Sequence, residues 1–197
     1  MRWQDSDKKE GQGSALDPSR AACFRTTGPE APSPISVTIY IDGDACPVRE
    51  EVYRVADRLQ LPVIVVSNGS RPIRPTGRPN VTMITVAAGA DIADDWIAER
   101  ITASDCCVTN DIPLASRCLA NGARALSPTG HHWTPDNIGT ALAGREISRH
   151  LRELGVGGAG PAPLTKVEKS RFLSALDTSV QALLRAHRTG RKDSSSA

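Results

Sequence analysis

Short runs of β-branched and other apolar residues alternate with segments of helical periodicity along the middle of this chain. The runs typical of buried strands are 35–42, 61–68, 81–86, 105–111 and 123–127. The segments with helical spacing between them are 46–60, 90–101 and 112–122. This alternation predicts an α/β fold, a three-layer sandwich in which a mostly parallel central sheet has helices on both faces.

The two ends of the chain differ in composition from this middle part. Residues 1–34 are rich in Gly, Pro, Ser and charged residues and have no periodicity, which predicts a disordered tail. A long helix is expected at 134–154, with Pro135 in its first position, and a last helix begins at the capping box Thr165 to Glu168. The expected division is a tail 1–34, an α/β domain 35–154, a Gly/Pro linker 155–164, a helix 165–187 that packs on the domain, and a second tail 188–197.

Composition excludes several classes of protein. A chain of 197 residues is the size of one domain, and a formal net charge of +2 gives no strong field toward a polyanion or a membrane. No apolar run approaches the roughly 18–20 residues of a membrane span, and the N-terminus lacks the apolar core of a secretory signal. The five cysteines have no disulfide-like or metal-like spacing. We therefore expect a cytoplasmic protein without a membrane partner.

Aspartates follow the predicted strands at the points where those strands end. Parallel α/β sheets bind ligands at the carboxyl ends of their strands, so these side chains are expected at one edge of the sheet. On the helix after the third strand, three of them are spaced to share one face. The six candidates are Asp42, Asp44, Asp91, Asp94, Asp95 and Asp111.

Several carboxylates at one edge need an explanation, because two of them about 4 Å apart repel by about 4 kcal/mol near a protein surface. Hard oxygen ligands for Mg²⁺ or Mn²⁺ are one explanation. Helix capping explains Asp44 and Asp91 equally well, and a solvated helix face explains Asp95. Asp42 and Asp111 follow strands directly, where no cap is expected, and this position favours metal ligands.

Five segments resemble the bacterial YaiI/YqxD family over about residues 36–186: IYIDGDACP, GADIADDWIAERI, DCCVTNDIPLASRCLANGA, TPDNI and RFLSALD. That family is in turn similar to PIN-like domains, which are metal-dependent nucleases. The resemblance implies three catalytic carboxylates. Asp42 ends the first strand, Asp94 lies on a central helix three residues before Ile97, and Asp111 closes a Thr-x-Asp strand end.

By the same resemblance, the expected activity is phosphodiester hydrolysis with Mg²⁺ or Mn²⁺, and the expected partner is nucleic acid, RNA in particular. Ser67 and Asn68, after the second strand, are candidate substrate contacts, although a turn explains them equally well. Three arginines in the loop 69–80 are candidate phosphate contacts, with a solvated loop as the alternative: Arg71, Arg74 and Arg78. The sequence does not indicate an oligomeric state.

Two other functions fit part of the pattern. Asp42 and Asp44 also resemble the first motif of haloacid-dehalogenase-like phosphatases, but that chemistry uses a downstream lysine, and no lysine lies between Lys9 and Lys166. A nucleic-acid-binding module without turnover would use the arginine loop alone. His131 and His132 are expected in a loop and Trp96 in the core.

Overall fold

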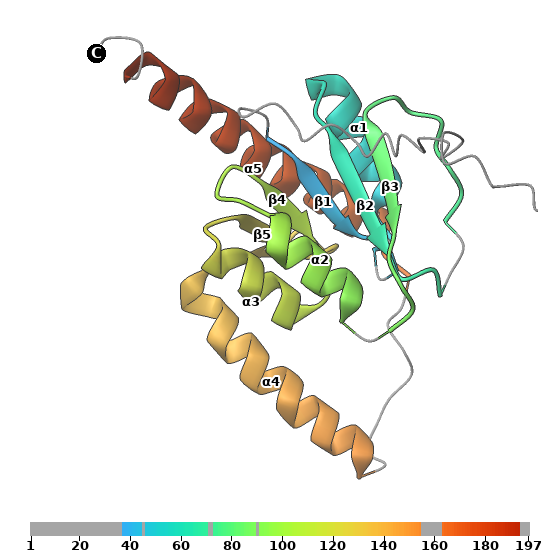
Figure 1. Ribbon diagram of the computed structural model, residues 1–197. Coiled ribbons are helices and arrows are strands. Elements are labelled where there is room, and N and C mark those ends of the chain that lie inside the picture. Colours follow the sequence, from blue (N-terminus) through green and yellow to red (C-terminus); the bar gives the residue numbers. More distant parts are fainter. Residues whose placement is uncertain (1–36, 45, 71–72, 90, 155–162, 194–197) are drawn as a thin grey trace, which may run out of the picture. The chain divides into compact units, whose positions relative to one another are not determined.

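A six-stranded sheet with the order β3-β2-β1-β4-β5-β6 forms the centre of the fold in a computed structural model (Figure 1). Each neighbouring pair is parallel except β5 and β6, which are antiparallel. The predicted mostly parallel sheet is confirmed. The strands are β1 (Ile39–Asp42), β2 (Val63–Ser67), β3 (Val81–Thr85), β4 (Cys106–Val108), β5 (Arg124–Leu126) and β6 (His132–Trp133).

The structure describes residues 37–44, 46–70, 73–89, 91–154 and 163–193, which belong to one compact unit. The predicted tail 1–34 and most of the predicted linker 155–164 lie outside these residues. The helices are α1 (Arg49–Leu59), α2 (Ile92–Arg100), α3 (Ile112–Ala120), α4 (Pro135–Glu153) and α5 (Lys166–Asp193). None of the helices in this described part of the chain is long and apolar enough to span a bilayer.

The helices form two outer layers. One core cluster joins α1 and α5 to one face of the sheet, and a second joins α2 and α3 to the other face. α4 packs against α3 (Figure 1). Alternate side chains of β1 enter the two cores: Ile39 and Ile41 face α1 and α5, and Tyr40 faces α2 and α3. A strand buried on both faces explains why its sequence is continuously apolar.

The last helix is an integral part of the first core. Phe172, Leu176 and Val180, at intervals of four residues, are each 0% exposed. The predicted capping box is present, because Glu168 N–H donates to Thr165 Oγ1 (3.2 Å) and Thr165 N–H donates to Glu168 Oε2 (2.8 Å). The helix continues to Asp193, past the end expected at residue 187.

Two local predictions were wrong. The helix expected from residue 46 begins at Arg49, because Val48 takes the N-cap position and Pro47 precedes it. The expected loop at His131 and His132 contains β6, a strand of two residues that is too short to show a period of two in the sequence. His132 Nδ1 lies 3.2 Å from Ser179 Oγ of α5, so this strand is also tied to the last helix.

Candidate functional site

The glycine between the first two aspartates allows a close approach of two chain segments. Gly43 N–H donates to the carbonyl of Val66 on β2 at 2.7 Å. A Cβ atom on Gly43 would lie 2.9 Å from that carbonyl oxygen and 2.7 Å from Ile73 Cδ1. A larger residue therefore does not fit, and the turn holds Asp42 and Asp44 at the end of β1.

We expect Gly43→Ala to lower the free energy of unfolding by about 2 kcal/mol, because backbone must move to accept the added methyl group. Gly139→Ala is the matched control. Gly139 lies inside α4, and beyond the backbone of the helix itself no atom lies within 4 Å of the added Cβ, so alanine should stabilise the helix by about 0.5–1 kcal/mol. Urea denaturation of both variants checks the prediction, and equal effects of the two substitutions would contradict it.

Thr109 links the ends of β1 and β4. Its hydroxyl, on a side chain that is 0% exposed, donates to Asp42 Oδ2 at 3.1 Å and accepts from Asp111 N–H at 2.9 Å. Asp42 itself is 6% exposed. The Thr-x-Asp pattern at 109–111 therefore connects Asp111 to the buried Asp42 through one side chain.

Asp111 has two partners that were not predicted. Its Oδ2 accepts from Leu114 N–H at 3.0 Å and so caps α3, and its Oδ1 pairs with the guanidinium of Arg145 on α4. The expectation that Asp111 follows a strand without capping a helix was wrong. The reason is that α3 begins at the very next residue, Ile112.

Asp94 interacts electrostatically with the other carboxylates. The pKa of Asp94 is raised to about 7, chiefly by burial and then by the charges of Asp42, Asp111 and Asp91, while Arg117 opposes the rise. Carboxylates from β1, from α2 and from the start of α3 are thus close enough to disfavour one another's ionisation.

Asp42 experiences the same environment. Burial raises its pKa above the usual value, and the hydrogen bond from Thr109 opposes this rise. The charges of Asp44 and Asp111 add smaller increases. A cation beside such a carboxyl group would stabilise its ionised form, which burial and the neighbouring charges disfavour.

Asp44 is held by the end of β2. Ser67 Oγ donates to its Oδ1 at 2.7 Å, and Asn68 N–H donates to its Oδ2 at 2.8 Å. Capping of α1 by Asp44 was one interpretation of the sequence, and it is wrong because Val48 is the N-cap residue. Ser67 and Asn68, predicted as substrate contacts, position Asp44.

The remaining two aspartates differ in their surroundings. Asp91 precedes α2 in the left-handed region, with φ of 61°, and its side chain makes no cap hydrogen bond. The capping alternative for Asp91 is therefore wrong. Asp95 pairs with Arg117 at 2.7 Å, and its side chain is 55% exposed. The predicted shared face of α2 thus places Asp94 toward the other carboxylates and leaves Asp95 with an arginine.

Within the described residues, no three Asp, Glu, His or Cys side chains are arranged to hold a metal ion as they stand. The carboxylates meet at one edge, but Asp111 is occupied by the cap bond to α3 and by Arg145. The metal site predicted from Asp42, Asp94 and Asp111 would need a rearrangement of these partners.

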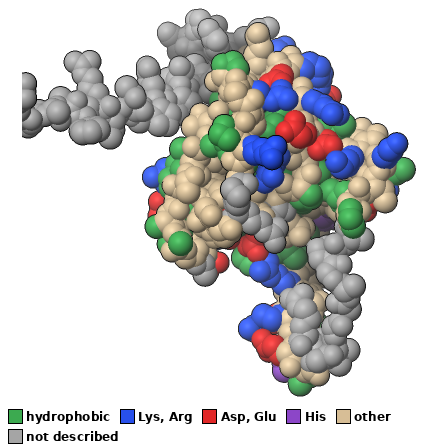
Figure 2. Space-filling view, turned by 90° about the vertical axis from the view of Figure 1, so that its right-hand side faces the viewer, with side chains coloured by type: hydrophobic (Ala, Val, Ile, Leu, Met, Phe, Trp, Pro, Cys, Tyr) green, Lys and Arg blue, Asp and Glu red, His purple; other side chains and the backbone are tan. Residues whose placement is uncertain are grey.

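The two described arginines of the loop, Arg74 and Arg78, differ in their surroundings. Arg78 pairs with Asp57 and Glu50 of α1 and stacks over the ring of Tyr53, with its Cζ 5.4 Å from the ring centroid. Arg74 is exposed, and Arg71 lies outside the described residues. Figure 2 shows cationic and anionic side chains interspersed on the face that it presents. The predicted phosphate-binding role therefore has little support at Arg78.

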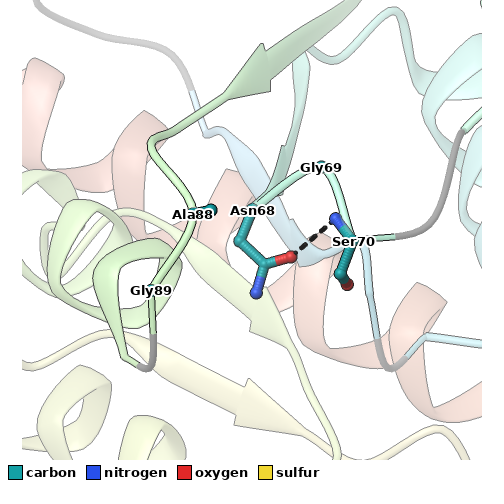
Figure 3. Close-up of a pocket in the computed structure, with 5 residues that line it drawn as sticks. All are labelled: Asn68, Gly69, Ser70, Ala88 and Gly89. Atoms are coloured by element: carbon teal, nitrogen blue, oxygen red, sulfur yellow. Dashed lines mark hydrogen bonds between the residues drawn. The ribbon is translucent and has the colours of Figure 1, made fainter.

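A pocket of about 300 Å³ lies between the segments that follow β2 and β3 (Figure 3). Asn68, whose N–H donates to Asp44, forms part of its wall, and its Oδ1 accepts from Ser70 N–H at 2.9 Å. No motif points to the opposite wall, since Ala88 and Gly89 carry no functional group. The lining residues are Asn68, Gly69, Ser70, Ala88 and Gly89.

Comparison with known proteins identifies relatives over most of the domain. A UPF0178 protein of Paramagnetospirillum magneticum is 54% identical over 142 residues, which cover 72% of this chain and 93% of the relative. A UPF0178 protein of Parvibaculum lavamentivorans is 50% identical over 147 residues, 75% of this chain and 95% of the relative. No solved structure matches the chain significantly.

Residues 40–182 match the sequence profile described as "Uncharacterized BCR, YaiI/YqxD family". This range contains all six aspartates of the sheet edge and reaches into α5. It agrees with the resemblance seen in the sequence motifs. The chain therefore belongs to the YaiI/YqxD family.

Proposed function

We propose that this protein is a metal-dependent nuclease that hydrolyses phosphodiester bonds, with RNA as substrate and with Mg²⁺ or Mn²⁺ held by Asp42, Asp94 and Asp111. The observation that supports it is the meeting of these carboxylates at the carboxyl edge of the sheet, where burial and mutual repulsion raise the pKa values of Asp42 and Asp94. A bound cation would offset that repulsion.

The side chains at the site suit a hard divalent ion. The donors are carboxylate oxygens, which Mg²⁺ and Mn²⁺ prefer. Cys46 is the thiol that follows the Asp-Gly-Asp turn, and its burial raises its pKa to about 12, so it stays protonated and is a poor ligand for a softer metal. When bound, the ion would supply positive charge for the attacking water and for the phosphate oxygens.

The protein's own residues would orient the groups around that ion. Thr109 fixes the direction of the Asp42 carboxylate, and Ser67 and Asn68 fix Asp44 beside it. The pocket next to Asn68 would receive the part of a substrate that flanks the scissile phosphate. Two neighbouring segments of one sheet edge would thus hold the reacting phosphate and its flanking nucleotide.

The phosphatase alternative has less support. In that mechanism the second aspartate of the motif donates a proton to the leaving group. Both oxygens of Asp44 already accept hydrogen bonds, from Ser67 Oγ and from Asn68 N–H. The lysine positions of the described residues lie on α5, where Lys169 pairs with Glu51 at 3.1 Å on the α1 side of the sheet.

The non-catalytic binding module also loses support, because it depended on the arginine loop and Arg78 is engaged with Asp57 of α1. The binding module and the proposed nuclease differ in whether the bound nucleic acid is cleaved. Divalent-ion binding with no cleavage of any nucleic acid would favour the module.

The direct test is an assay of the purified full chain on short labelled RNA and DNA. We expect cleavage of RNA with Mn²⁺ or Mg²⁺ and none with excess chelator, because the carboxylates alone do not supply the positive charge that the reaction needs. Restoring the ion after chelation should restore cleavage. Cleavage that persists in chelator would contradict the proposal.

A further inference from the structure

Of the three proposed metal ligands, Asp111 alone forms an ion pair within the described residues, and its partner is Arg145. Its guanidinium contacts Asp111 Oδ1, and the two side chains are 44% and 23% exposed. Asp42 and Asp94 have no ion pair in the same part of the chain. Arg145 therefore occupies a ligand atom that a bound cation would use.

Both oxygens of Asp111 have a donor. Oδ2 is committed to Leu114 N–H, which is part of the α3 cap, whereas Oδ1 carries only the arginine. Breaking the cap bond to Leu114 would disturb the start of α3. Breaking the contact with Arg145 only requires that one exposed side chain move. Oδ1 is therefore the oxygen that an incoming ion can take at the smaller cost.

α4 places Arg145 where such a movement is possible. The helix packs on the second core through Ile138 and Leu142, and its residues 143–150 are exposed. Arg145 lies just past this packed part and its side chain is exposed, so its guanidinium can move while the helix stays in place. One turn later, Arg149 has similar exposure but pairs with Glu146 and Glu153 of its own helix.

We infer that Arg145 and the divalent cation compete for Asp111, and that the displaced guanidinium binds the substrate's phosphate at the edge of the site. This inference rests on the proposed function. A guanidinium fork matches the paired oxygens of a phosphate, so the same side chain that neutralises Asp111 in the metal-free protein suits an anionic substrate once the ion has taken over.

The first measurement needs no catalysis. Full-length wild type, Arg145→Gln and the matched control Arg149→Gln are stripped with chelator and melted over a range of Mn²⁺ concentrations. We expect Arg145→Gln to reach half-maximal stabilisation at an about fivefold lower Mn²⁺ concentration than wild type, because its competitor is gone. Arg149→Gln should follow the wild-type curve.

The second measurement uses short RNA with saturating Mn²⁺. Loss of a phosphate contact in Arg145→Gln should raise KM by about tenfold with kcat changed much less, because the contact holds substrate and transition state alike. Arg149→Gln should retain both constants. Equal KM values for the two variants would overturn the phosphate contact.

The outcomes distinguish this inference from the proposed function. A wild type that Mn²⁺ stabilises, together with identical Mn²⁺ curves for all three proteins, overturns the competition and leaves the nuclease proposal standing. No response to Mn²⁺ in any of the three proteins overturns both. A shifted curve for Arg145→Gln alone supports the inference.

Discussion

Asp42→Asn is expected to reduce the cleavage of RNA by at least about 100-fold while the domain stays folded. The substitution keeps the shape of a side chain that is 6% exposed and preserves an oxygen that can accept from Thr109. It removes the negative charge that would hold the cation at the end of β1. Initial rates in Mn²⁺, with circular dichroism as a check on folding, measure the effect.

Asp95→Asn is the matched comparison, because Asp95 lies on the same helix as Asp94 but pairs with Arg117 at 2.7 Å. The sequence alone predicts a metal ligand at both positions. In the structure Asp95 forms an ion pair with Arg117, whereas Asp94 is influenced by the charges of the other carboxylates. We expect Asp95→Asn to change the rate by less than about threefold, since exposed ion pairs contribute little. Equal losses in the two variants would mean that the acidic edge acts only through its total charge.

Asp94→Asn is expected to stabilise the metal-free protein at neutral pH by about 3 kcal/mol, from a pKa raised from 3.8 to about 7 and partial screening by water. The folded state binds the proton of Asp94 more tightly than the unfolded state does. This contribution to stability is therefore fully present below about pH 4 and is lost as the pH rises toward 7. The neutral amide removes that loss.

The measurement is a series of urea melts of both proteins in chelator between pH 4 and pH 8. The difference in unfolding free energy should be small at the acid end, grow with pH and level off above about pH 7. Asp42, Asp111 and Asp91 cause part of the shift, and Arg117 opposes it, so the curve reports on the whole cluster. Adding Mn²⁺ at pH 7.5 should reverse the order by stabilising the wild type. A difference that stays constant with pH would show that neither burial nor the neighbouring carboxylates raise the pKa of Asp94.

Local patterns were sufficient to predict the layers of the fold. The β-branched runs of β1 and β2 and the capping box at Thr165 each depend on residues close together in the chain, and each is present in the structure. The family was visible for the same reason, since its motifs are short and contiguous.

The partners of the acidic side chains depend on tertiary contacts and were not predicted. Arg145 reaches Asp111 from a position 34 residues away, and Asp44 is held by residues 23 and 24 positions later, at the end of the neighbouring strand and just after it. No local spacing encodes such pairs. The role of Gly43 was missed for a related reason, because the atoms that exclude a side chain there belong to β2 and to Ile73.

The position of β1 in the sheet has a consequence for the synthesis of the protein. β1 is the first of the described strands to leave the ribosome, yet it lies at the centre, with β2 on one side and β4 on the other. A nascent chain that ends before Cys106 therefore exposes an unpaired edge of its central strand, and the face later covered by Phe172 of α5 stays open longer still. Because Thr109 follows β4, the link from Asp42 to Asp111 also forms late. The site is thus incomplete until more than half of the chain has been made.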